Sequence, residues 1–461
     1  MARQTRHIFG RPFFLLLPLL FAGIAWGQSI TLSSVTFGMQ CGPGKSSNCP
    51  VVGGTITLPT EPGTLRLWDS QVDWSHLNPN QSGSNQWDFT TLDQYLDAIV
   101  SAPNVQDVIY TFGWVPCWDT ANPSTDCNGP ATSPNGSSYP PSDLVTTSCG
   151  PNGSGSSTFN SFVNELTTHC NSNGHCVKNF IKYYEMWNEA NASFWGEPGW
   201  NQATSAEELY CMVAPATTII KNNVSGAKIL TPSINAATGY ETWMEYWLRD
   251  EVSGGVISNA YNIHTYLKDN THTPEYTYAN TVVNQLAPNT NVSGWSALPW
   301  LMSETNFDPV TLECDNSHVS DCTGQIVRWQ SILNSNGAFN VSWYFWNTTI
   351  GDYGDPNDLN PTYAEAYYYM MQYMEGGKFT SACSYTGTVS NELWTCAFKD
   401  TNSNSDLWVW TNNDTNQPYS VPSGYVKYWD LTGACNTIPT SGFTVSVEPY
   451  LLVKTSCSVE P

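Results

Sequence analysis

Two glutamates, Glu189 and Glu304, each end a short run of apolar and aromatic residues. Glu189 ends the run YYEMWNE, and Glu304 ends the run WLMSE. If both runs are strands of one parallel barrel, their ends converge on a single pocket and the two carboxylates face each other across it. Hydrolysis of a glycosidic bond needs such a pair, because one carboxyl must be protonated to donate to the leaving oxygen while the other is ionised. We therefore interpret Glu189 and Glu304 as a candidate catalytic pair.

Polar residues fall on one face of the neighbouring strand-like runs. Alternate residues of a strand share a face, so Asn262, His264 and Tyr266 lie together, and Arg66 shares a face with Trp68. Polar groups gathered on the inward face of a barrel, near its mouth, are typical of a functional site. We expect Arg66, Trp68, His264 and Tyr266 to take part in binding the substrate.

Each of these residues also has a structural interpretation. Glu189 could be a carboxylate at a helix start, and the Ser-Glu-Thr sequence around Glu304 could cap a helix. His264 could be a hydrogen-bonded structural histidine, and Arg66 could simply pair with Asp69. Glu185 shares the parity of Glu189 but lies deeper, so we interpret it as buried structure.

Eight strand-like runs follow one another between residues 35 and 346. Most are rich in β-branched or aromatic residues and are bounded by Gly, Pro, Asn or Ser. They are Val35–Gln40, Thr64–Asp69, Asp107–Gly113, Lys182–Asn188, Lys228–Ser233, Ala260–Tyr266, Trp300–Ser303 and Val341–Trp346. Helical patterns lie between them at Phe89–Ser101, Thr158–Cys170, Ala206–Lys221, Tyr240–Val252, Gly324–Asn334 and Thr362–Met374. This alternation predicts an α/β fold, a closed (β/α)8 TIM barrel. The alternative, a doubly wound open sheet, usually opens with a Gly-rich phosphate turn, which the sequence lacks.

A long segment rich in Ser, Pro, Gly, Asn and Cys, residues 115–157, follows the third run. In a barrel such a loop projects from the C-terminal face. It could form a wall of the cleft or be a solvated insertion. Most of the 20 Trp residues should lie in the core, but Trp68, Trp118 and Trp195 fall near loops of the mouth and are candidates to stack on sugar rings.

After Gly377 the pattern changes to short strand-like runs separated by turn residues. They are Leu393–Phe398, Asp406–Asn412, Tyr425–Leu431, Gly442–Val447 and Tyr450–Lys454. This pattern predicts a small antiparallel β-domain. The expected organisation is a signal peptide at 1–27, a catalytic barrel at 28–376 and a C-terminal β-sandwich-like domain at 377–461.

The first 27 residues have the zones of a secretory signal. Three Arg residues precede an apolar run at 13–26, and the small residue Gly27 follows it. The run is too short to span a bilayer comfortably, although an uncleaved anchor is the alternative. We expect a secreted or periplasmic protein, whose formal charge changes from −23 to −26 when three Arg and no acid are removed.

All 14 cysteines lie after this segment, and an even count in an exported chain indicates disulfides. Proximity suggests the pairs Cys41–Cys49, Cys117–Cys127, Cys170–Cys176, Cys314–Cys322, Cys383–Cys396 and Cys435–Cys457. That leaves Cys149 and Cys211. No CxxC, CxxCH or HExxH pattern occurs, so zinc, haem and redox chemistry have no support. We expect no metal and no cofactor.

The composition narrows the class of partner. The 461 residues include 16 Lys+Arg and 39 Asp+Glu, and only 12% of residues are charged. This acidity argues against nucleic acid and against anionic membrane surfaces, since both are bound through Lys and Arg. A surface rich in Asn, Ser, Thr and Trp suits a neutral polar partner, although solubility alone could explain the acidity. We expect a carbohydrate substrate, no nucleic acid, no membrane after signal removal, and a monomer.

Several of these features together resemble glycoside hydrolase clan A. The resemblance rests on WNE at 187–189 after a strand-like run, Glu304 ending a later run, HTY at 264–266 between them and Trp346 ending the eighth run. It covers the whole barrel. The LRLWD and YTFGWVP runs and the C-terminal β-domain resemble family 39-like members. The Cys-rich third loop departs from the family pattern and leaves the family and the substrate open.

The resemblance implies a retaining mechanism. Glu189 corresponds to the acid/base, Glu304 to the nucleophile and Asn188 to the residue that hydrogen-bonds the sugar 2-hydroxyl. Trp346 corresponds to the aromatic floor of the cleavage subsite, and His264 is a neighbour of the acid/base.

The resemblance also assigns Arg66 and Tyr266 to the nucleophile, as the groups that keep Glu304 ionised and touch it. The charge of Glu304 would then disfavour a second charge nearby. We therefore expect the pKa of Glu189 to lie above the roughly 4.3 of a free Glu.

The leading hypothesis is a secreted retaining β-glycosidase that hydrolyses O-glycosidic bonds of a polysaccharide or glycoconjugate by double displacement. Long mouth loops and many Trp favour an extended cleft and endo-action. An exo-acting β-xylosidase-like enzyme is the alternative within this class. A non-catalytic carbohydrate-binding protein on a glycosidase-like barrel is the alternative of another class, and the presence of both Glu189 and Glu304 argues against it.

Overall fold

The computed structural model describes residues 30–41, 62–68, 70–123, 127, 136–196, 201–236, 239–267, 275–306, 319–344, 361–388, 392–412 and 416–454. For residues 319–322 and 361–364 it describes the backbone alone. The expected signal peptide and Trp346 lie outside these residues, so both stay predictions.

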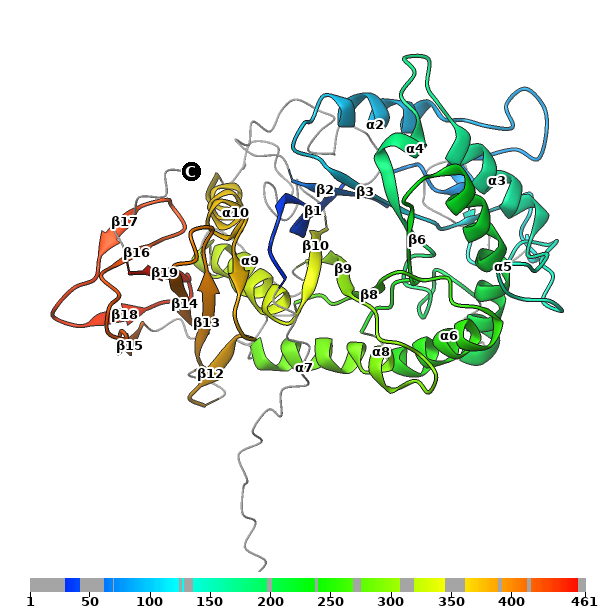
Figure 1. The fold of residues 1–461 in the computed structure, drawn as a ribbon. Helices are drawn as coiled ribbons and strands as arrows, with labels where there is room; N and C mark the ends of the chain where they lie inside the picture. Colours follow the sequence, from blue (N-terminus) through cyan, green and yellow to red (C-terminus); the bar gives the residue numbers. More distant parts are fainter. Residues whose placement is uncertain are drawn as a thin grey trace, which may run out of the picture.

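The larger part of the molecule is built around a sheet of eight parallel strands (Figure 1). They are β1 (Phe37–Gln40), β2 (Thr64–Leu67), β3 (Asp107–Thr111), β6 (Ile181–Glu185), β7 (Lys228–Leu230), β8 (Tyr261–His264), β9 (Trp300–Thr305) and β10 (Ala338–Trp343). They pair in the order β7-β6-β3-β2-β1-β10-β9-β8. A parallel bridge between Leu230 and Ala260 joins the two ends of this sheet. The eight predicted strands and the TIM-barrel fold are therefore confirmed.

Helices cover the outside of the barrel (Figure 1). The long ones are α2 (Thr90–Val100), α3 (Ser157–Thr168), α5 (Gln202–Asn223), α6 (Tyr240–Gly254), α7 (Glu275–Leu286), α9 (Val319–Ser335) and α10 (Pro361–Met374). The short ones are η1 (Ser34–Thr36), α1 (Trp74–Leu77), α4 (Val177–Phe180) and α8 (Pro288–Asn291). Six long helices match the predicted patterns. Helix α7 was not predicted, because its residues include many Thr, Asn, Val and Tyr, which are weak helix formers.

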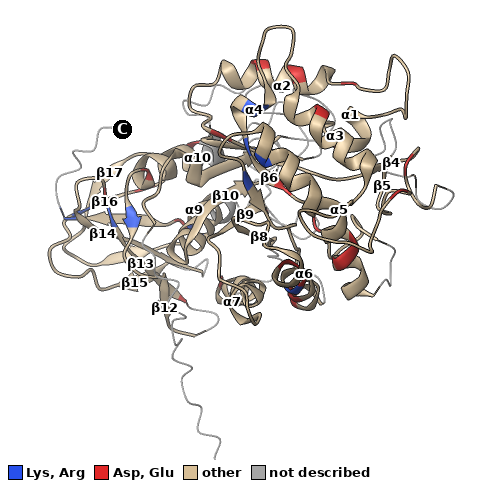
Figure 2. Ribbon diagram, turned by 45° about the vertical axis from the view of Figure 1, so that its right-hand side comes forward, with Lys and Arg blue, Asp and Glu red and all other residues tan. Residues whose placement is uncertain are grey.

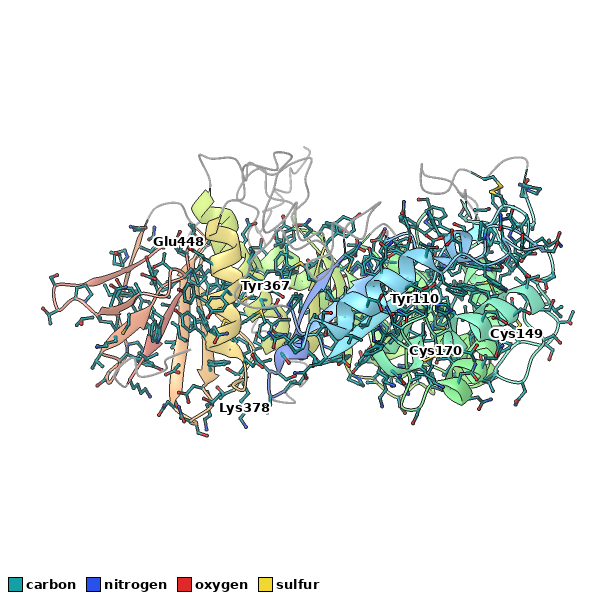
Figure 3. The ribbon with its side chains drawn as sticks, turned by 90° about the horizontal axis from the view of Figure 1, so that it is seen from above. Tyr110, Cys149, Cys170, Tyr367, Lys378 and Glu448 are labelled. Carbon is teal, nitrogen blue, oxygen red and sulfur yellow. A yellow bond between two sulfur atoms is a disulfide. The ribbon has the colours of Figure 1, made fainter. Side chains whose placement is uncertain are left out.

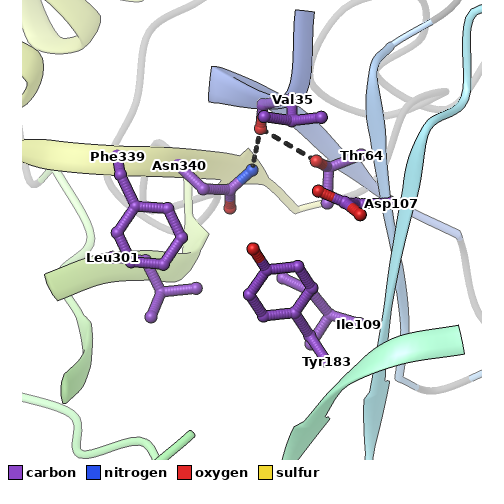
Figure 4. A pocket seen from close by; sticks show the side chains of 8 residues that line it. All are labelled: Val35, Thr64, Asp107, Ile109, Tyr183, Leu301, Phe339 and Asn340. Carbon is purple, nitrogen blue, oxygen red and sulfur yellow. Dashed lines mark hydrogen bonds between the residues drawn. The ribbon is translucent and has the colours of Figure 1, made fainter. Parts of the chain in front are cut away.

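The lower end of the barrel, where the strands begin, is filled by an apolar layer. The layer consists of Ile109, Leu230, Ala260 and Leu301, with Tyr183 and Phe339 packed against them. Figure 4 shows a small pocket beside it, in which the Val35 carbonyl accepts hydrogen bonds from Thr64 Oγ1 (2.8 Å) and Asn340 Nδ2 (2.6 Å). The layer separates this end of the barrel from the polar residues at the other end.

The chain after residue 377 forms antiparallel sheets, as predicted (Figure 1). Its strands are β11 (Lys378–Phe379), β12 (Ser384–Thr386), β13 (Leu393–Lys399), β14 (Ser405–Thr411), β15 (Gln417–Tyr419), β16 (Lys427–Trp429), β17 (Cys435–Thr437), β18 (Phe443–Val445) and β19 (Tyr450–Val453). The main sheet has the order β11-β13-β14-β19-β16-β17, with β12 paired to β13, and β15 pairs with β18. Phe443 and Val445 of β18 pack on Val409 and Leu452 of the main sheet. The two sheets therefore enclose a small core of their own.

The other face of the main sheet packs on the barrel helices. Trp408 and Trp429 contact Tyr373 of α10, with ring centroids 6.2 and 5.3 Å apart. Trp410 Nε1 donates to Glu275 Oε2 of α7 at 2.7 Å. The buried core is continuous from the barrel into this sheet.

Charged residues are unevenly distributed over the fold. Figure 2 shows Asp and Glu on the outer helices, whereas Lys and Arg are sparse. No helix of the described residues is long and apolar enough to cross a membrane.

Four disulfides lie within the described residues. Three are predicted pairs, Cys117–Cys127, Cys170–Cys176 and Cys383–Cys396. The fourth joins the two remaining cysteines, Cys149 and Cys211. It ties the long loop after β3 to α5, at the edge of the barrel labelled by Cys149 in Figure 3. The three other predicted pairs include cysteines outside the described side chains.

We expect the disulfides to differ in their contribution to stability. Cys149–Cys211 has a sequence separation of 62 and Cys170–Cys176 one of 6. The loop-entropy relation then gives about 4 kcal/mol for the first and about 2 kcal/mol for the second. The Cys149→Ser/Cys211→Ser variant should therefore lose about twice as much free energy of unfolding as Cys170→Ser/Cys176→Ser. Urea denaturation of both variants and the wild type measures this, and equal losses would contradict it.

Candidate active site

The barrel brings the predicted site residues to one end of the molecule. Arg66 lies on β2, His264 on β8 and Glu304 on β9, while Asn188 and Glu189 follow β6. The C-terminal ends of barrel strands converge, so these side chains meet although they are far apart in sequence. All five residues are buried, with exposed fractions between 0 and 9%.

Arg66 is the centre of a hydrogen-bond network. Its Nε and Nη2 donate to the two oxygens of Glu185, each at 2.9 Å, and Nη2 also donates to Asn188 Oδ1 at 2.7 Å. Its Nη1 donates to Gln40 Oε1 at 2.7 Å and to Glu304 Oε2. These five bonds equal the number of N–H donors in a guanidinium. Burial lowers the pKa of Arg66, but Glu185 and Glu304 raise it by more, so Arg66 stays positively charged.

Glu304 is held by one donor on each oxygen. Arg66 Nη1 donates to Oε2, and the Tyr266 hydroxyl donates to Oε1. Burial raises the pKa of Tyr266 well above its ordinary value, and the charges of Glu304 and Glu189 add to the rise. The hydroxyl therefore stays protonated and available as a donor. A positive charge on one side and a donor on the other form an environment that suits a carboxylate.

Glu189 has a different set of partners. Its Oε1 lies 3.1 Å from His264 Nδ1, and its Oε2 accepts from Asn235 Nδ2 at 3.0 Å. Its backbone has a φ of 38°, in the left-handed region that residues with a side chain rarely adopt. Ser233 Oγ accepts from the Glu189 N–H at 2.8 Å and helps to hold this conformation. Backbone strain of this kind persists only where the surroundings impose it, and it concentrates at active sites.

The pKa of Glu189 is lowered, which contradicts the rise expected from the sequence. Burial alone raises this pKa, but the hydrogen bond and charge of His264, the hydrogen bond of Asn235 and the charge of Arg66 outweigh burial. The expectation was wrong because it considered the charge of Glu304 and omitted the donors.

The two candidate catalytic carboxylates lie close together. One donor atom from each of Glu189, His264 and Glu304 lies within 4.8 Å of the others. Such a group can hold a divalent cation, but Arg66 already brings a positive charge to Glu304 and Tyr266 occupies its second oxygen. These contacts disfavour a metal between the carboxylates.

An aromatic cluster lies at the mouth, on segments that follow β2, β3 and β6. Trp68 stacks on Trp114, with centroids 6.5 Å apart, and meets Phe194 edge to face at 5.7 Å. Gly113 lies against the Trp68 ring, where a Cβ would come within 2.2 Å of a ring atom. Trp68 is only 3% exposed, whereas Trp114 is half-buried. Trp114, which the sequence analysis did not select, therefore presents the more accessible ring.

The other selected tryptophans have different surroundings. Trp118 is half-buried and donates its indole N–H to the Asn78 carbonyl at 2.9 Å. Trp195 is buried edge to face against Trp187 and donates to the Ser205 carbonyl at 2.9 Å. Trp195 thus packs in the core, and a role of Trp118 toward substrate stays a prediction.

The long loop after β3 follows the barrel wall for part of its course. It begins with a two-residue pairing of β4 (Val115–Pro116) with β5 (Gly136–Ser137). Farther along, Cys149 is bonded to Cys211 of α5, and the Pro151 carbonyl accepts from Thr218 Oγ1 at 3.1 Å. This later part packs on the outer helices, so residues 149–151 are not a wall of the cleft.

The sequence analysis missed several residues of the site. Gln40, Ser233 and Asn235 bond directly to Arg66 or Glu189. Each stands at or just after the C-terminal end of a barrel strand, and this position was the signal that could have identified them. Glu185, interpreted as buried structure, is bonded to Arg66 by two hydrogen bonds.

Replacing His264 by Phe should raise the pKa of Glu189. The variant removes the donor on Oε1 while the burial of the carboxyl persists, so the pKa of Glu189 should rise. Carbon-13 titration of labelled Glu measures the change, with the Glu189 signal assigned from its loss in Glu189→Gln. An unchanged Glu189 pKa in His264→Phe would show that His264 does not hold it down.

Comparison with known proteins supports the barrel assignment. No family model and no curated protein matches the chain. Among solved structures, a family 39 glycoside hydrolase from the gut symbiont Bacteroides cellulosilyticus matches with 15% identity and a TM-score of 0.54, covering 85% of this chain and 75% of that one. A family 39 enzyme from Xanthomonas axonopodis pv. citri matches with 13% identity and a TM-score of 0.56, covering 92% and 95%. The catalytic domain of a family 30 xylanase C from Talaromyces cellulolyticus matches with 12% identity and a TM-score of 0.52, covering 92% and 99%. The chain thus has the fold of these glycoside hydrolases, as the resemblance to clan A implied.

Proposed function

We propose that this chain is a secreted retaining β-glycosidase that cleaves O-glycosidic bonds of a polysaccharide or glycoconjugate. The observation that carries the proposal is the pair Glu189 and Glu304 at the barrel mouth. One oxygen of each lies within 4.8 Å of one oxygen of the other, and the two carboxylates have unlike partners. Retaining enzymes place their carboxyls about 5–5.5 Å apart, whereas inverting enzymes need about 6.5–9.5 Å to admit a water. The short separation supports double displacement.

In the first step Glu304 attacks the anomeric carbon and forms a glycosyl ester, while the glycosidic oxygen takes a proton and leaves as an alcohol. Arg66 and Tyr266 fix both oxygens of Glu304 before the attack. Glu189 delivers the proton. His264, 3.1 Å from Glu189 Oε1, and Asn235, 3.0 Å from Oε2, hold this carboxyl in place for the transfer.

In the second step water attacks the same carbon and releases Glu304. Glu189 takes the proton of this water, for which the ionised form favoured by His264 and Asn235 is suited. Glu189 thereby regains the proton that it gave up in the first step, and the site returns to its initial state. Two inversions at one carbon give a product with the configuration of the substrate.

The substrate would contact residues around this pair. Asn188 Oδ1 is taken by Arg66, so its NH2 group is what it can offer to the sugar 2-hydroxyl. Trp114 would bind sugar through its accessible ring face, with Trp68 packed against it as support, and Trp118 and Trp346 are proposed as further aromatic contacts, Trp346 as the floor. The chain is proposed to act after export, since disulfides such as Cys149–Cys211 suit an oxidising compartment.

We propose endo-action, on the strength of the long loops at the mouth and the number of aromatic residues. Proteins of this fold include a β-xylosidase from Caulobacter crescentus and an endoglucanase from Clostridium thermocellum, so the fold does not decide between exo- and endo-action. Size analysis of the products from β-linked polysaccharides separates the two. Intermediate-length fragments early in the reaction indicate endo-action, and single sugars alone indicate exo-action.

Glu304→Gln should abolish turnover, because an amide cannot attack the anomeric carbon. Binding should persist, since the amide keeps the size of the carboxyl. Activity on a panel of β-glycans and binding by calorimetry are measured on the same preparation. Binding without turnover in the wild type would instead identify a carbohydrate-binding protein and refute the enzyme proposal.

Glu189→Ala should lose activity in a way that depends on the leaving group. Without the acid, kcat/KM on substrates with poor leaving groups should fall by roughly 10²–10⁴-fold. Activated aryl glycosides need no proton for the first step, so kcat/KM on these substrates should be retained. Azide should then replace water in the second step and give a β-glycosyl azide, identifiable by NMR. If Glu304→Ala gave this product instead, the two roles would be reversed.

A further inference from the structure

Glu185 is a third carboxylate at the site, and the two chemical steps do not use it. It lies at the end of β6 and is fully buried. Its Oε1 and Oε2 accept from Arg66 Nη2 and Nε, each at 2.9 Å, and Oε2 also accepts from Thr111 Oγ1 at 2.9 Å. Burial raises its pKa, but the charges of Arg66 and His264 lower it by more, so Glu185 is ionised.

The bidentate pair fixes the plane of the Arg66 guanidinium. Two parallel N–H to oxygen bonds allow one orientation, in contrast to a single bond about which the group can turn. In that orientation Nη1 reaches Glu304 and Gln40, and Nη2 reaches Asn188. The position of the nucleophile therefore depends on Glu185 through Arg66.

Glu185 also provides the charge that Arg66 needs when Glu304 is consumed. In the free protein Arg66 faces two carboxylates, Glu185 and Glu304. Once Glu304 is esterified by a sugar, its charge disappears. A buried guanidinium without a counter-charge is strongly unfavourable, and Glu185 is the carboxylate that would remain bonded to it.

The same carboxylate faces the partner of the acid/base. His264 Nε2 lies 3.8 Å from Glu185 Oε1, while its Nδ1 lies 3.1 Å from Glu189 Oε1. Around Glu185 the charged and titratable groups are thus Arg66 from β2 and His264 from β8, with the Thr111 hydroxyl from β3 and the Ser233 hydroxyl after β7. A negative charge at this place disfavours a further negative charge nearby and so favours the protonated form of Glu189.

We propose that Glu185 is a positioning residue that acts on both catalytic carboxylates, orienting Glu304 through Arg66 and favouring, through its charge, the protonated form of Glu189. The inference rests on the proposed glycosidase function. It assigns a role in the reaction cycle to a residue that neither contacts the sugar nor exchanges a proton.

The test is Glu185→Gln, with Glu251→Gln as a matched control. Glu251 is equally buried and accepts bonds from Trp247 and Ser258, but it lies on α6 outside the barrel. In Glu185→Gln the amide offers N–H where Arg66 needs an acceptor, so kcat/KM should fall roughly 10²-fold. Losing the negative charge makes protonated Glu189 less stable, so the alkaline limb of the pH–rate profile should move roughly one unit to lower pH. The control Glu251→Gln should unfold at a lower denaturant concentration than the wild type, whereas the alkaline limb of its pH–rate profile should stay at the wild-type pH.

A second variant separates the effect of the charge of Glu185 from the effect of its side-chain length. Glu185→Asp keeps the charge but shortens the side chain, so the rate should fall while the alkaline limb stays. If Glu185→Gln does not fold, Glu185→Asp is compared with Thr111→Val, in which Glu185 keeps both its charge and its length. A larger fall in rate in Glu185→Asp than in Thr111→Val supports the positioning role, and equal rates contradict it. Wild-type rates in Glu185→Asp, or an unmoved limb in folded Glu185→Gln, would overturn the inference.

A measurement without turnover distinguishes this inference from the proposed function. Carbon-13 titration should show the pKa of Glu189 lower in Glu185→Gln than in the wild type, whether or not a substrate is known. A wild type that hydrolyses no glycoside refutes the enzyme proposal alone. An unchanged Glu189 titration in Glu185→Gln refutes the coupling alone.

Discussion

The buried guanidinium of Arg66 is the constraint around which the mouth of the barrel is organised. Removing a positive charge from water is costly, and the cost is offset only when the charge is paired and its donors are satisfied. Five acceptor contacts from Gln40, Glu185, Asn188 and Glu304 meet this requirement. They come from β1, β6, the turn after β6 and β9, so the closed barrel is what brings them together. A change in strand register would leave this cation without a full set of acceptors.

The interior of the barrel changes character along its axis. At the lower end Ile109, Leu230 and Leu301 fill the space with apolar atoms, whereas the upper end holds the charged network around Arg66. The apolar layer lies below the network, and the low dielectric of buried surroundings strengthens each hydrogen bond in the network. The same condition explains why the pKa of Glu189 depends so strongly on its immediate donors.

The sequence predicted the fold and the meeting of Glu189 and Glu304 at one end of the barrel, because both depend on local patterns. The β-branched and aromatic runs identified all eight barrel strands, and the strand ends located Glu189 and Glu304. The partners were harder to predict, since Asn235 and Gln40 acquire a role only from neighbours distant in sequence. The pKa of Glu189 was predicted with the wrong sign because the contacts of His264 and Asn235 were unknown. Helix α7 escaped prediction because packing, not propensity, makes its residues helical.

The contacts between the C-terminal sheet and the barrel limit how the two parts can be separated or exchanged by recombination. Trp410 bonds to Glu275 at the start of α7, and Trp408 packs on Tyr373 of α10. A gene fragment that encoded the barrel alone would expose these surfaces of α7 and α10 to water and leave the barrel prone to aggregation. Exchange of the sheet between related proteins would succeed only together with the helices that it covers. The barrel and its sheet are therefore expected to fold as one unit, although the described site residues all come from the barrel.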